Sequence, residues 1–595
     1  MSRVPFAAAC ALALFGLPLR AGAQSPPAPP PPPTPPPLAS PSAPLPSATP
    51  LPGETPTPST PPLPGETPAP GATPLPGETP APGQTPAPGA TPTPIPSGAP
   101  SVSPQPGVPI RIDRAKVGVV PGGTVVLSVA GGIGPLTAQP SFSGVNARYD
   151  PLARTLTLSG GAPGRGTVTL ADAAGDSASV NVLVAPPAGV VPADAAVELA
   201  GEVAPDFAAS RIQAALDQLA QRRPGSTVTY RGVTLPAALH PGDVLDAQAQ
   251  VRVDGYDAYV DASGTTGVHL RVAALPKLDP QVLFYSDDPE RLGAGADGVL
   301  FRGTVDAARP ARAYVYHVSD TPGRRLYLAL RAAGASTRVQ VLGAMAGPND
   351  AFSYVGHTST LRYLQTRPAQ QSYVATVTPD APYLIPLGAP MKAGELVSAI
   401  QDLRVLEGGP LEVDVVAAGT DAAALAYLNG PELPGDGHGR RGEFALDAVP
   451  PLALAYTVGG AEPAPFVIGN ALIPNLRPGG RALAGDYGVL RPVQLQLANP
   501  TPSPQNVFLY EVAGGGGATT TFRFDGDPAP TSVLCVNDPA NRYLVKQFAL
   551  APGETRTVTG EYMTDGTSYL PIDFGLSATP PLAVPPKACN PRPAA

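Results

Sequence analysis

Tryptophan is absent from the 595-residue chain, which also has only five histidines and three cysteines. Binding sites for sugars commonly use flat aromatic rings, and tryptophan above all, so its absence argues against a carbohydrate-binding protein. Nineteen tyrosines could take its place, and a glycan ligand therefore stays open as an alternative.

Positive charge is scarce as well. Lysine and arginine together number 38 against 46 acidic residues, which gives a formal net charge of −8. No basic cluster is longer than an arginine pair, such as Arg440 and Arg441. Because binding to phosphate backbones requires a basic face, the composition argues against a nucleic-acid partner.

Recognisable catalytic motifs are missing. The sequence contains no Gly-x-Ser-x-Gly turn, no glycine-rich phosphate loop and no histidine pair at zinc-binding spacing. His357 stands near Ser359, but we interpret this serine as a helix cap, and we interpret His317 as a hydrogen-bonded histidine of a sheet. We therefore expect a protein that is not an enzyme, with a secreted hydrolase as a lower-ranking alternative.

The only long apolar run lies at the N-terminus, from Val4 to Leu19, after Arg3 and before the small residues Ala21 and Ala23. This arrangement predicts a secretory signal peptide over residues 1–23, with an uncleaved anchor as the alternative. We expect no integral membrane segment once the signal is removed. The predicted location is secreted, periplasmic or at the cell surface.

Removal of the signal would take Cys10 away and leave Cys535 and Cys589. In an oxidising compartment two cysteines are expected to pair, so the sequence predicts a disulfide between them. The alternative is two unpaired thiols, one in "SVLCV" and one on the C-terminal tail.

Proline dominates residues 24–108, where the heptapeptide "PLPGETP" begins at Pro50, Pro62 and Pro74. Such a composition cannot form a core, so this segment is predicted to be a disordered linker that acts as a spacer. A ligand for proline-reading domains is the alternative function.

Beyond the linker, short alternating apolar and polar runs separated by Gly and Pro turns predict a mainly β chain. The expected fold class is a series of antiparallel β-sandwiches with one α+β unit, because the segment is too long for one core. The predicted limits are 109–186 for a sandwich, 187–276 for a small α+β domain, 277–428 for a second sandwich, 443–585 for a third, and 586–595 for a tail.

The clearest predicted helix follows "PDFAASRIQAALDQLAQRRPG" from Pro205. Its apolar stripe contains Ile212, Ala215, Leu216 and Leu219, and we expect this stripe to pack on neighbouring strands rather than on a membrane.

Two segments resemble bacterial immunoglobulin-like (Big-type) modules of secreted and surface proteins. The phrases are "PGGTVVLSV", "GGAPGRGTVTLAD" and "SASVNVLVA" at about 109–184, and "LAPGETRTV" within 443–585. The middle region resembles uncharacterised secreted bacterial proteins. The resemblance implies β-sandwich modules, which in that family serve mostly as spacers and less often in adhesion.

Two charged loops are the candidate sites. "YSDDPERLGAGADG" offers Asp287, Asp288, Glu290 and Asp297 as oxygen ligands for calcium, with a solvated turn as the alternative. "GDGHGRRGEF", at 435–444, is interpreted as an interdomain hinge or a recognition tip. No other cofactor is expected.

These observations together predict a secreted or cell-envelope protein with a structural or partner-binding, adhesion-like role. The expected partner is a protein or glycan of the envelope or the extracellular space. A glycan-binding protein and a secreted hydrolase are the alternatives.

Overall fold

The computed structural model of the chain describes residues 108–437, 440–447, 449–469, 472–483 and 485–584. Strands predominate in these ranges, with three helices, so the predicted mainly β class is confirmed. The predicted signal peptide, the linker up to residue 107 and the tail 586–595 lie outside the described residues. In the ranges above, no helix has the length and apolar character needed to cross a membrane.

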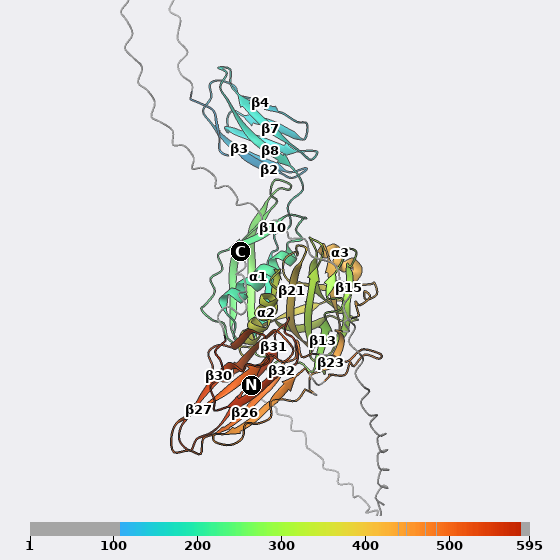
Figure 1. The fold of residues 1–595 in the computed structure, drawn as a ribbon. Coiled ribbons are helices and arrows are strands. Elements are labelled where there is room, and N and C mark those ends of the chain that lie inside the picture. Colours follow the sequence, from blue (N-terminus) through green and yellow to red (C-terminus); the bar gives the residue numbers. More distant parts are fainter. Residues whose placement is uncertain (1–107, 438–439, 448, 470–471, 484, 585–595) are drawn as a thin grey trace, which may run out of the picture. The chain divides into compact units, whose positions relative to one another are not determined.

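The first sandwich, drawn in blue to cyan in Figure 1, consists of two four-stranded sheets. Successive side chains of a strand point to opposite faces, so burial alternates along its strands. The inward residues form one core, with Leu127 and Leu156 from one sheet and Val168 and Val180 from the other. The strands are β1 (Arg111–Ile112), β3 (Thr124–Ala130), β6 (Thr155–Gly160) and β5 (Val145–Asp150) in one sheet, and β2 (Lys116–Val119), β8 (Ser177–Val184), β7 (Gly164–Ala171) and β4 (Thr137–Pro140) in the other.

A large mixed sheet of eleven strands spans residues 194–445. Its neighbouring strands are, in order, β10 (Thr227–Arg231), β11 (Val244–Asp254), β12 (Ala262–Ala273), β9 (Asp194–Ala200), β19 (Ser372–Val377), β18 (Thr337–Asn349), β21 (Glu395–Glu407), β16 (Ala311–Ser319), β13 (Val282–Ser286) and β23 (Arg441–Ala445), while β14 (Arg291–Leu292) pairs with β16 beside this path. Strand β16 is buried along its whole length. This is the pattern of a strand that is covered on both faces of the sheet.

A four-stranded sheet covers one face of the large sheet. Val315 of β16 shares a core with Leu328 and Val413 of the smaller sheet. Its strands are β15 (Gly298–Val305), β22 (Leu411–Ala418), β17 (Arg325–Ala332) and β20 (Tyr383–Pro386), and the short helix α3 (Asp421–Tyr427) packs against β22. The opposite face of the large sheet carries Tyr314 and Tyr316, which pack in a separate core with helix α2 (Phe352–Thr366).

Helix α1 (Pro205–Leu219) begins at the predicted proline and packs against β9 and β10. Ala208, Ile212 and Leu216 are buried in the core of the large sheet, so the expected packing on strands is confirmed. The predicted stripe is wrong at one end, because Leu219 is 43% exposed. The buried side instead follows the four-residue spacing of 208, 212 and 216.

The last sandwich consists of a five-stranded and a four-stranded sheet around an aromatic core. Phe522 contacts Tyr562 and Phe574, with ring centroids 4.8 and 5.2 Å apart. The strands are β24 (Leu452–Thr457), β26 (Arg491–Ala498), β31 (Thr555–Thr564), β28 (Ala518–Phe524) and β29 (Thr531–Val536) in one sheet, and β25 (Phe466–Ile468), β32 (Ile572–Ser577), β27 (Gln505–Val512) and β30 (Tyr543–Leu550) in the other.

Most strand pairs are antiparallel, as predicted, but β2 with β8, β9 with β12, β13 with β16, β14 with β16 and β24 with β26 run parallel. Parallel neighbours require a crossover connection in place of a hairpin, and alternation within a strand does not reveal this. Strand β9, from the segment 187–276, pairs with β19 of the segment 277–428, and residues 443–445 lie in β23. The limits of the folding domains remain a prediction.

Candidate functional site

The two charged loops lie side by side in the structure. Strand β13 ends at Ser286, which pairs with Arg441 at the start of β23, so one loop leaves the sheet where the other arrives. The Asp287 N–H donates to the Arg440 carbonyl at 3.0 Å, and the Asp436 N–H donates to Asp288 Oδ1 at 2.5 Å. Strand pairing thus brings together two segments that are about 150 residues apart in the sequence.

Arg440 joins the carboxylates of this region. Its Nη1 lies 3.1 Å from Asp287 Oδ2, and its Nη2 lies 2.7 Å from Glu290 Oε2. The Asp287 side chain is 2% exposed, whereas those of Arg440 and Glu290 are about one quarter exposed. One guanidinium therefore forms ion pairs with two carboxylates.

Beside these groups lies a hollow of about 350 Å³, which we call the tyrosine pocket. Strands β13 and β16, helix α2 and two loops of the C-terminal region contribute to its walls. The lining residues are Tyr285, Asp287, Glu290, Tyr314, Tyr316, Phe352, Arg440, Tyr487, Gly566, Thr567, Ser568 and Tyr569.

Strand geometry explains the row of tyrosines. Tyr314 and Tyr316 are two residues apart in β16, so both side chains lie on the same face of the large sheet. Tyr285 pairs directly with Tyr314 in the neighbouring strand, and their rings stack with centroids 5.1 Å apart. The Tyr314 and Tyr316 rings are 6.5 Å apart and nearly parallel.

The opposite wall comes from the loop after β31. Tyr487 donates a hydrogen bond from its hydroxyl to the Ser568 carbonyl. Gly566 allows this loop to approach the sheet, because a Cβ there would lie 2.9 Å from both Tyr314 Oη and the Tyr316 ring. Asp565 anchors the loop to α2 by accepting a hydrogen bond from His357 Nδ1 at 2.7 Å. Burial raises the pKa of Asp565 to about 6.

Two polar atoms at the pocket have no hydrogen-bond partner among the described residues: Asp287 Oδ1 and Tyr285 Oη. Both side chains are buried, and burial raises the pKa of each well above its ordinary value, against the opposing effect of the Arg440 guanidinium. A buried acceptor without a partner costs free energy. A ligand that donates a hydrogen bond to Asp287 Oδ1 would remove this cost.

The calcium candidates are only partly brought together. Asp287, Asp288 and Glu290 lie on one loop, but Asp297 forms an ion pair with Arg324 at 2.7 Å. In the described part of the chain, no group of three or more His, Cys, Asp or Glu residues is arranged to hold a metal ion. Arginines are the observed partners of Asp287, Glu290 and Asp297, whereas Asp288 accepts from the Asp436 N–H. Calcium binding stays a prediction.

The described histidines are dispersed. His317 is buried in β16, with Nδ1 bonded to the Pro289 carbonyl at 2.8 Å and Nε2 to Ser286 Oγ at 2.9 Å. Burial lowers the pKa of His317 to about 4, which keeps the ring neutral, as expected for a sheet histidine. Ser359 lies inside α2 and bonds to the Gly356 carbonyl and Ser398, so its interpretation as a cap is wrong.

Two of the predicted residues, His438 of the second loop and Cys589 of the tail, lie outside the described residues. Cys535 lies in β29, where its backbone N–H donates to Thr519 Oγ1 at 3.1 Å. The disulfide between Cys535 and Cys589 stays a prediction.

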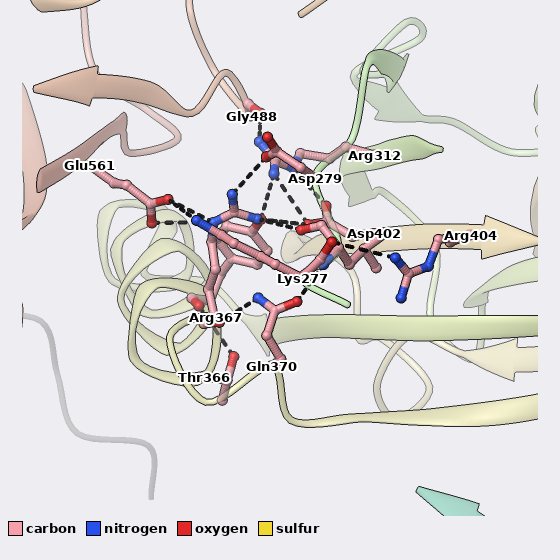
Figure 2. Close-up of polar contacts among 12 residues, drawn as sticks. Lys277, Asp279, Arg312, Thr366, Arg367, Gln370, Asp402, Arg404, Gly488 and Glu561 are labelled. Carbon is pink, nitrogen blue, oxygen red and sulfur yellow. Dashed lines mark hydrogen bonds and ion pairs between the residues drawn. The ribbon is translucent and has the colours of Figure 1, made fainter. Parts of the chain in front are cut away.

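A second polar cluster, the arginine junction, consists of Arg312, Tyr363, Arg367, Asp402 and Glu561. Arg312 donates to the two carboxylate oxygens of Asp402 at 2.7 and 3.2 Å. Figure 2 shows Arg367 between Glu561 and Asp402, with Nε at 3.0 and 3.2 Å from the two Glu561 oxygens. Both buried cations are therefore paired, as burial of charge requires. Because Glu561 belongs to β31, the junction links the last sandwich to the large sheet.

Two larger hollows accompany these sites, and in each a carboxylate of the lining is paired with arginine. One, of about 960 Å³, adjoins the arginine junction and includes the paired Arg367 and Glu561. The other, of about 600 Å³, lies beside α1, where Glu198 accepts from Arg271 at 2.8 Å and from Arg338 at 2.6 Å. The tyrosine pocket is the better candidate site, because it holds the unpartnered carboxylate oxygen.

Sequence reasoning pointed to both charged loops but missed the tyrosines. The pair Tyr314 and Tyr316 in "YVYH" carried a usable signal, since alternate strand residues share a face. Tyr487 and Tyr569 carried none, because their place in the pocket depends on how distant segments pack.

No protein-family model matches the chain, and no curated protein matches it. Among solved structures, it is similar over 28% of its length to the whole N-terminal Ig1-2 module of the Drosophila receptor protein tyrosine phosphatase DLAR, at 14% identity and a TM-score of 0.13. It is similar over 48% of its length to 76% of the insect immune protein hemolin, at 10% identity and a TM-score of 0.14. It is also similar over 79% of its length to the M60 catalytic domain with two CBM51 domains of Clostridium perfringens ZmpB, at 7% identity and a TM-score of 0.16, and spans 54% of that chain.

Proposed function

We propose that this chain is a secreted or cell-envelope protein without catalytic activity, which holds β-sandwiches in series and binds an extracellular partner through the tyrosine pocket. The observation that carries the proposal is Asp287 Oδ1, a buried acceptor without a partner in the described residues, placed in an aromatic hollow. Sites that combine apolar walls with a few polar groups are typical of ligand binding.

The chemistry of the site favours binding over catalysis. Among the described residues, His317 contacts the first loop through the Pro289 carbonyl, and it has both ring nitrogens in hydrogen bonds and a lowered pKa. It is therefore not available as a general base. His357 directs Nδ1 toward Asp565, an arrangement that fixes the pocket loop to α2.

The test is the binding of labelled full chain to arrays of extracellular proteins and glycans. Asp287→Asn and Tyr316→Ala should lose the array signals of the wild type, because each alters the pocket. Tyr256→Ala is the matched control, because this tyrosine is 63% exposed and does not line the pocket. Thermal melts of each variant check that it is folded.

Equal binding by the wild type and both folded pocket variants would contradict the assignment of the pocket. Release of a cleavage product from a bound array member, detected by mass spectrometry, would contradict the absence of catalysis. A glycan is the second candidate partner, favoured by the five tyrosines that line the pocket.

A further inference from the structure

The charge of the tyrosine pocket is unbalanced. Its lining includes two carboxylates, Asp287 and Glu290, and one cation, Arg440. Arg440 contacts one oxygen of each carboxylate and leaves Asp287 Oδ1 without a partner in the described residues. The neighbouring Asp288 adds further negative charge beside Asp287. The pocket therefore has a place for one more positive group, which would favour the ionised form of Asp287 that burial disfavours.

The walls of the pocket suit a particular kind of cation. Aromatic rings carry partial negative charge on their faces and attract ammonium groups, most strongly where water is excluded. Tyr285 and Tyr314 are buried and stacked, and Tyr487 closes the hollow from the C-terminal region. Aromatic walls are a common arrangement for binding quaternary and methylated ammonium groups. A carboxylate among such walls adds the opposite charge.

We propose that the tyrosine pocket binds an organic ammonium group, held by Asp287 Oδ1 and the surrounding tyrosines. The inference rests on the proposed function and names the chemistry that the pocket recognises. An anion would meet two carboxylates, and a neutral sugar would leave the surplus charge in the pocket without a counter-ion. A primary or methylated ammonium group supplies both the charge and, when primary, the N–H donors.

The same chemistry can come from a free amine or from a lysine side chain of a protein partner. The hollow of about 350 Å³ is at the small end of ligand pockets, which suits a single aliphatic ammonium chain. It lies next to the loop at 435–437, in a segment interpreted from the sequence as a hinge or a recognition tip.

Isothermal titration of the full chain tests the proposal with matched probes. n-Butylamine and choline should bind, and neutral 1-butanol and anionic butyrate should bind at least tenfold more weakly. Tyrosine fluorescence gives a second readout that is free of tryptophan emission, because the chain has no tryptophan. Nα-acetyl-lysine methylamide, tested beside free butylamine, distinguishes the two sources of the ammonium group.

Asp287→Asn should weaken butylamine binding at least tenfold, because it removes the charge while keeping the shape. Glu290→Gln tests the same charge balance at a more exposed position, in case the buried variant does not fold. Asp297→Asn is the control, since Asp297 does not line the pocket and pairs with Arg324. This control should bind butylamine like the wild type.

Equal affinity for butylamine and 1-butanol would overturn the proposal, as would unchanged amine binding in folded Asp287→Asn and Glu290→Gln. Binding of methyl glycosides with no response to amines would overturn it in favour of a glycan.

Array partners that depend on the pocket but are not displaced by butylamine would overturn the ammonium chemistry and leave the proposed partner binding in place. Amine binding without any array partner would support the ammonium site and contradict the wider function.

Discussion

Glu511 of β27 is a carboxyl in the interior of the last sandwich. It is fully buried, accepts a hydrogen bond from the Thr520 hydroxyl, and has Oε1 without a partner among the described residues. Burial raises its pKa to about 8. Because the folded pKa lies above the unfolded one, the folded state holds the proton more tightly. Its contribution to stability is present at acidic pH and is lost as the pH rises toward and through 8.

Glu511→Gln should remove this pH dependence. We expect the variant to melt at a higher temperature than the wild type near pH 9 and at a similar temperature near pH 5, since each pKa unit corresponds to about 1.4 kcal/mol. Differential scanning calorimetry at both pH values measures the effect. Glu407→Gln, at an exposed side chain, is the control. The same dependence of melting temperature on pH in Glu511→Gln and the wild type would contradict the role of Glu511.

Gly566 is a second residue whose identity the packing determines. An added Cβ would meet Tyr314 Oη and the Tyr316 ring at 2.9 Å, so Gly566→Ala should push the loop off the sheet. We expect a loss of stability of about 1–3 kcal/mol, the usual cost of overpacking. Gly517→Ala is the control, because a Cβ added there would have nothing within 4 Å. Chemical denaturation of both variants tests this, and equal stabilities would contradict the close approach.

In helix α1, the spacing of apolar residues determines which side of the helix is buried. The buried residues Ala208, Ile212 and Leu216 follow one another at four-residue spacing, while Leu219 lies at the edge of that side. The last turn ends at Ala220, and Gln221 follows with a φ of 44°. Ala220 is the fourth buried position at this spacing, and the chain turns away directly after it.

Leu216→Ala and Leu219→Ala form a matched pair within this helix. We expect Leu216→Ala to cost about 2–5 kcal/mol, because its side chain is fully buried and its loss leaves a cavity. Leu219→Ala should cost less than about 1 kcal/mol. Denaturant unfolding followed by circular dichroism gives both values. A larger loss for Leu219→Ala would contradict the observed orientation of the helix.

Single strands and helices were more predictable from the sequence than the pairing of strands and the packing between elements. Alternation predicted many strands, and proline and apolar spacing predicted α1, because both signals are local. The pairing of Tyr285 with Tyr314 depends instead on β13 lying parallel to β16, which no local pattern specifies. The pocket wall from Gly566 and Tyr569 depends on packing between segments more than 200 residues apart. Local rules therefore identified the charged loops but not the aromatic residues beside them.

At the scale of the whole molecule, the arginine junction joins two of the folded parts that the structure describes. Arg367 follows α2, is 2% exposed, and contacts Glu561 of the last sandwich and Asp279 before β13. Removing one member of a buried ion pair leaves the other charge uncompensated, which is strongly destabilising. Because the ion pair of Arg367 and Glu561 connects the last sandwich to the large sheet, its loss should weaken the coupling between the unfolding of these two parts.

Arg367→Met should separate the unfolding of the last sandwich from that of the large sheet. Calorimetry at neutral pH should show two unfolding transitions in the variant, where the wild type shows a more cooperative one. The midpoint temperature of the lower transition should be several degrees below that of the wild type. Arg542→Met removes an exposed ion pair with Glu462 inside the last sandwich and is the control. A single unchanged transition in Arg367→Met would contradict a coupling role for the junction.

The position of β9 has a mechanical consequence. The chain enters the large sheet through this strand, which lies in the interior of the sheet between β12 and β19, and leaves through the edge strand β23. A pull along β9 loads the hydrogen bonds to both neighbours at once, in shear, whereas a pull across β23 can open its bonds one after another. Tension on the chain would therefore separate β23 from the large sheet before it separates β9. Because β23 borders the loop that holds Arg440, the first part to yield under load would be a wall of the tyrosine pocket.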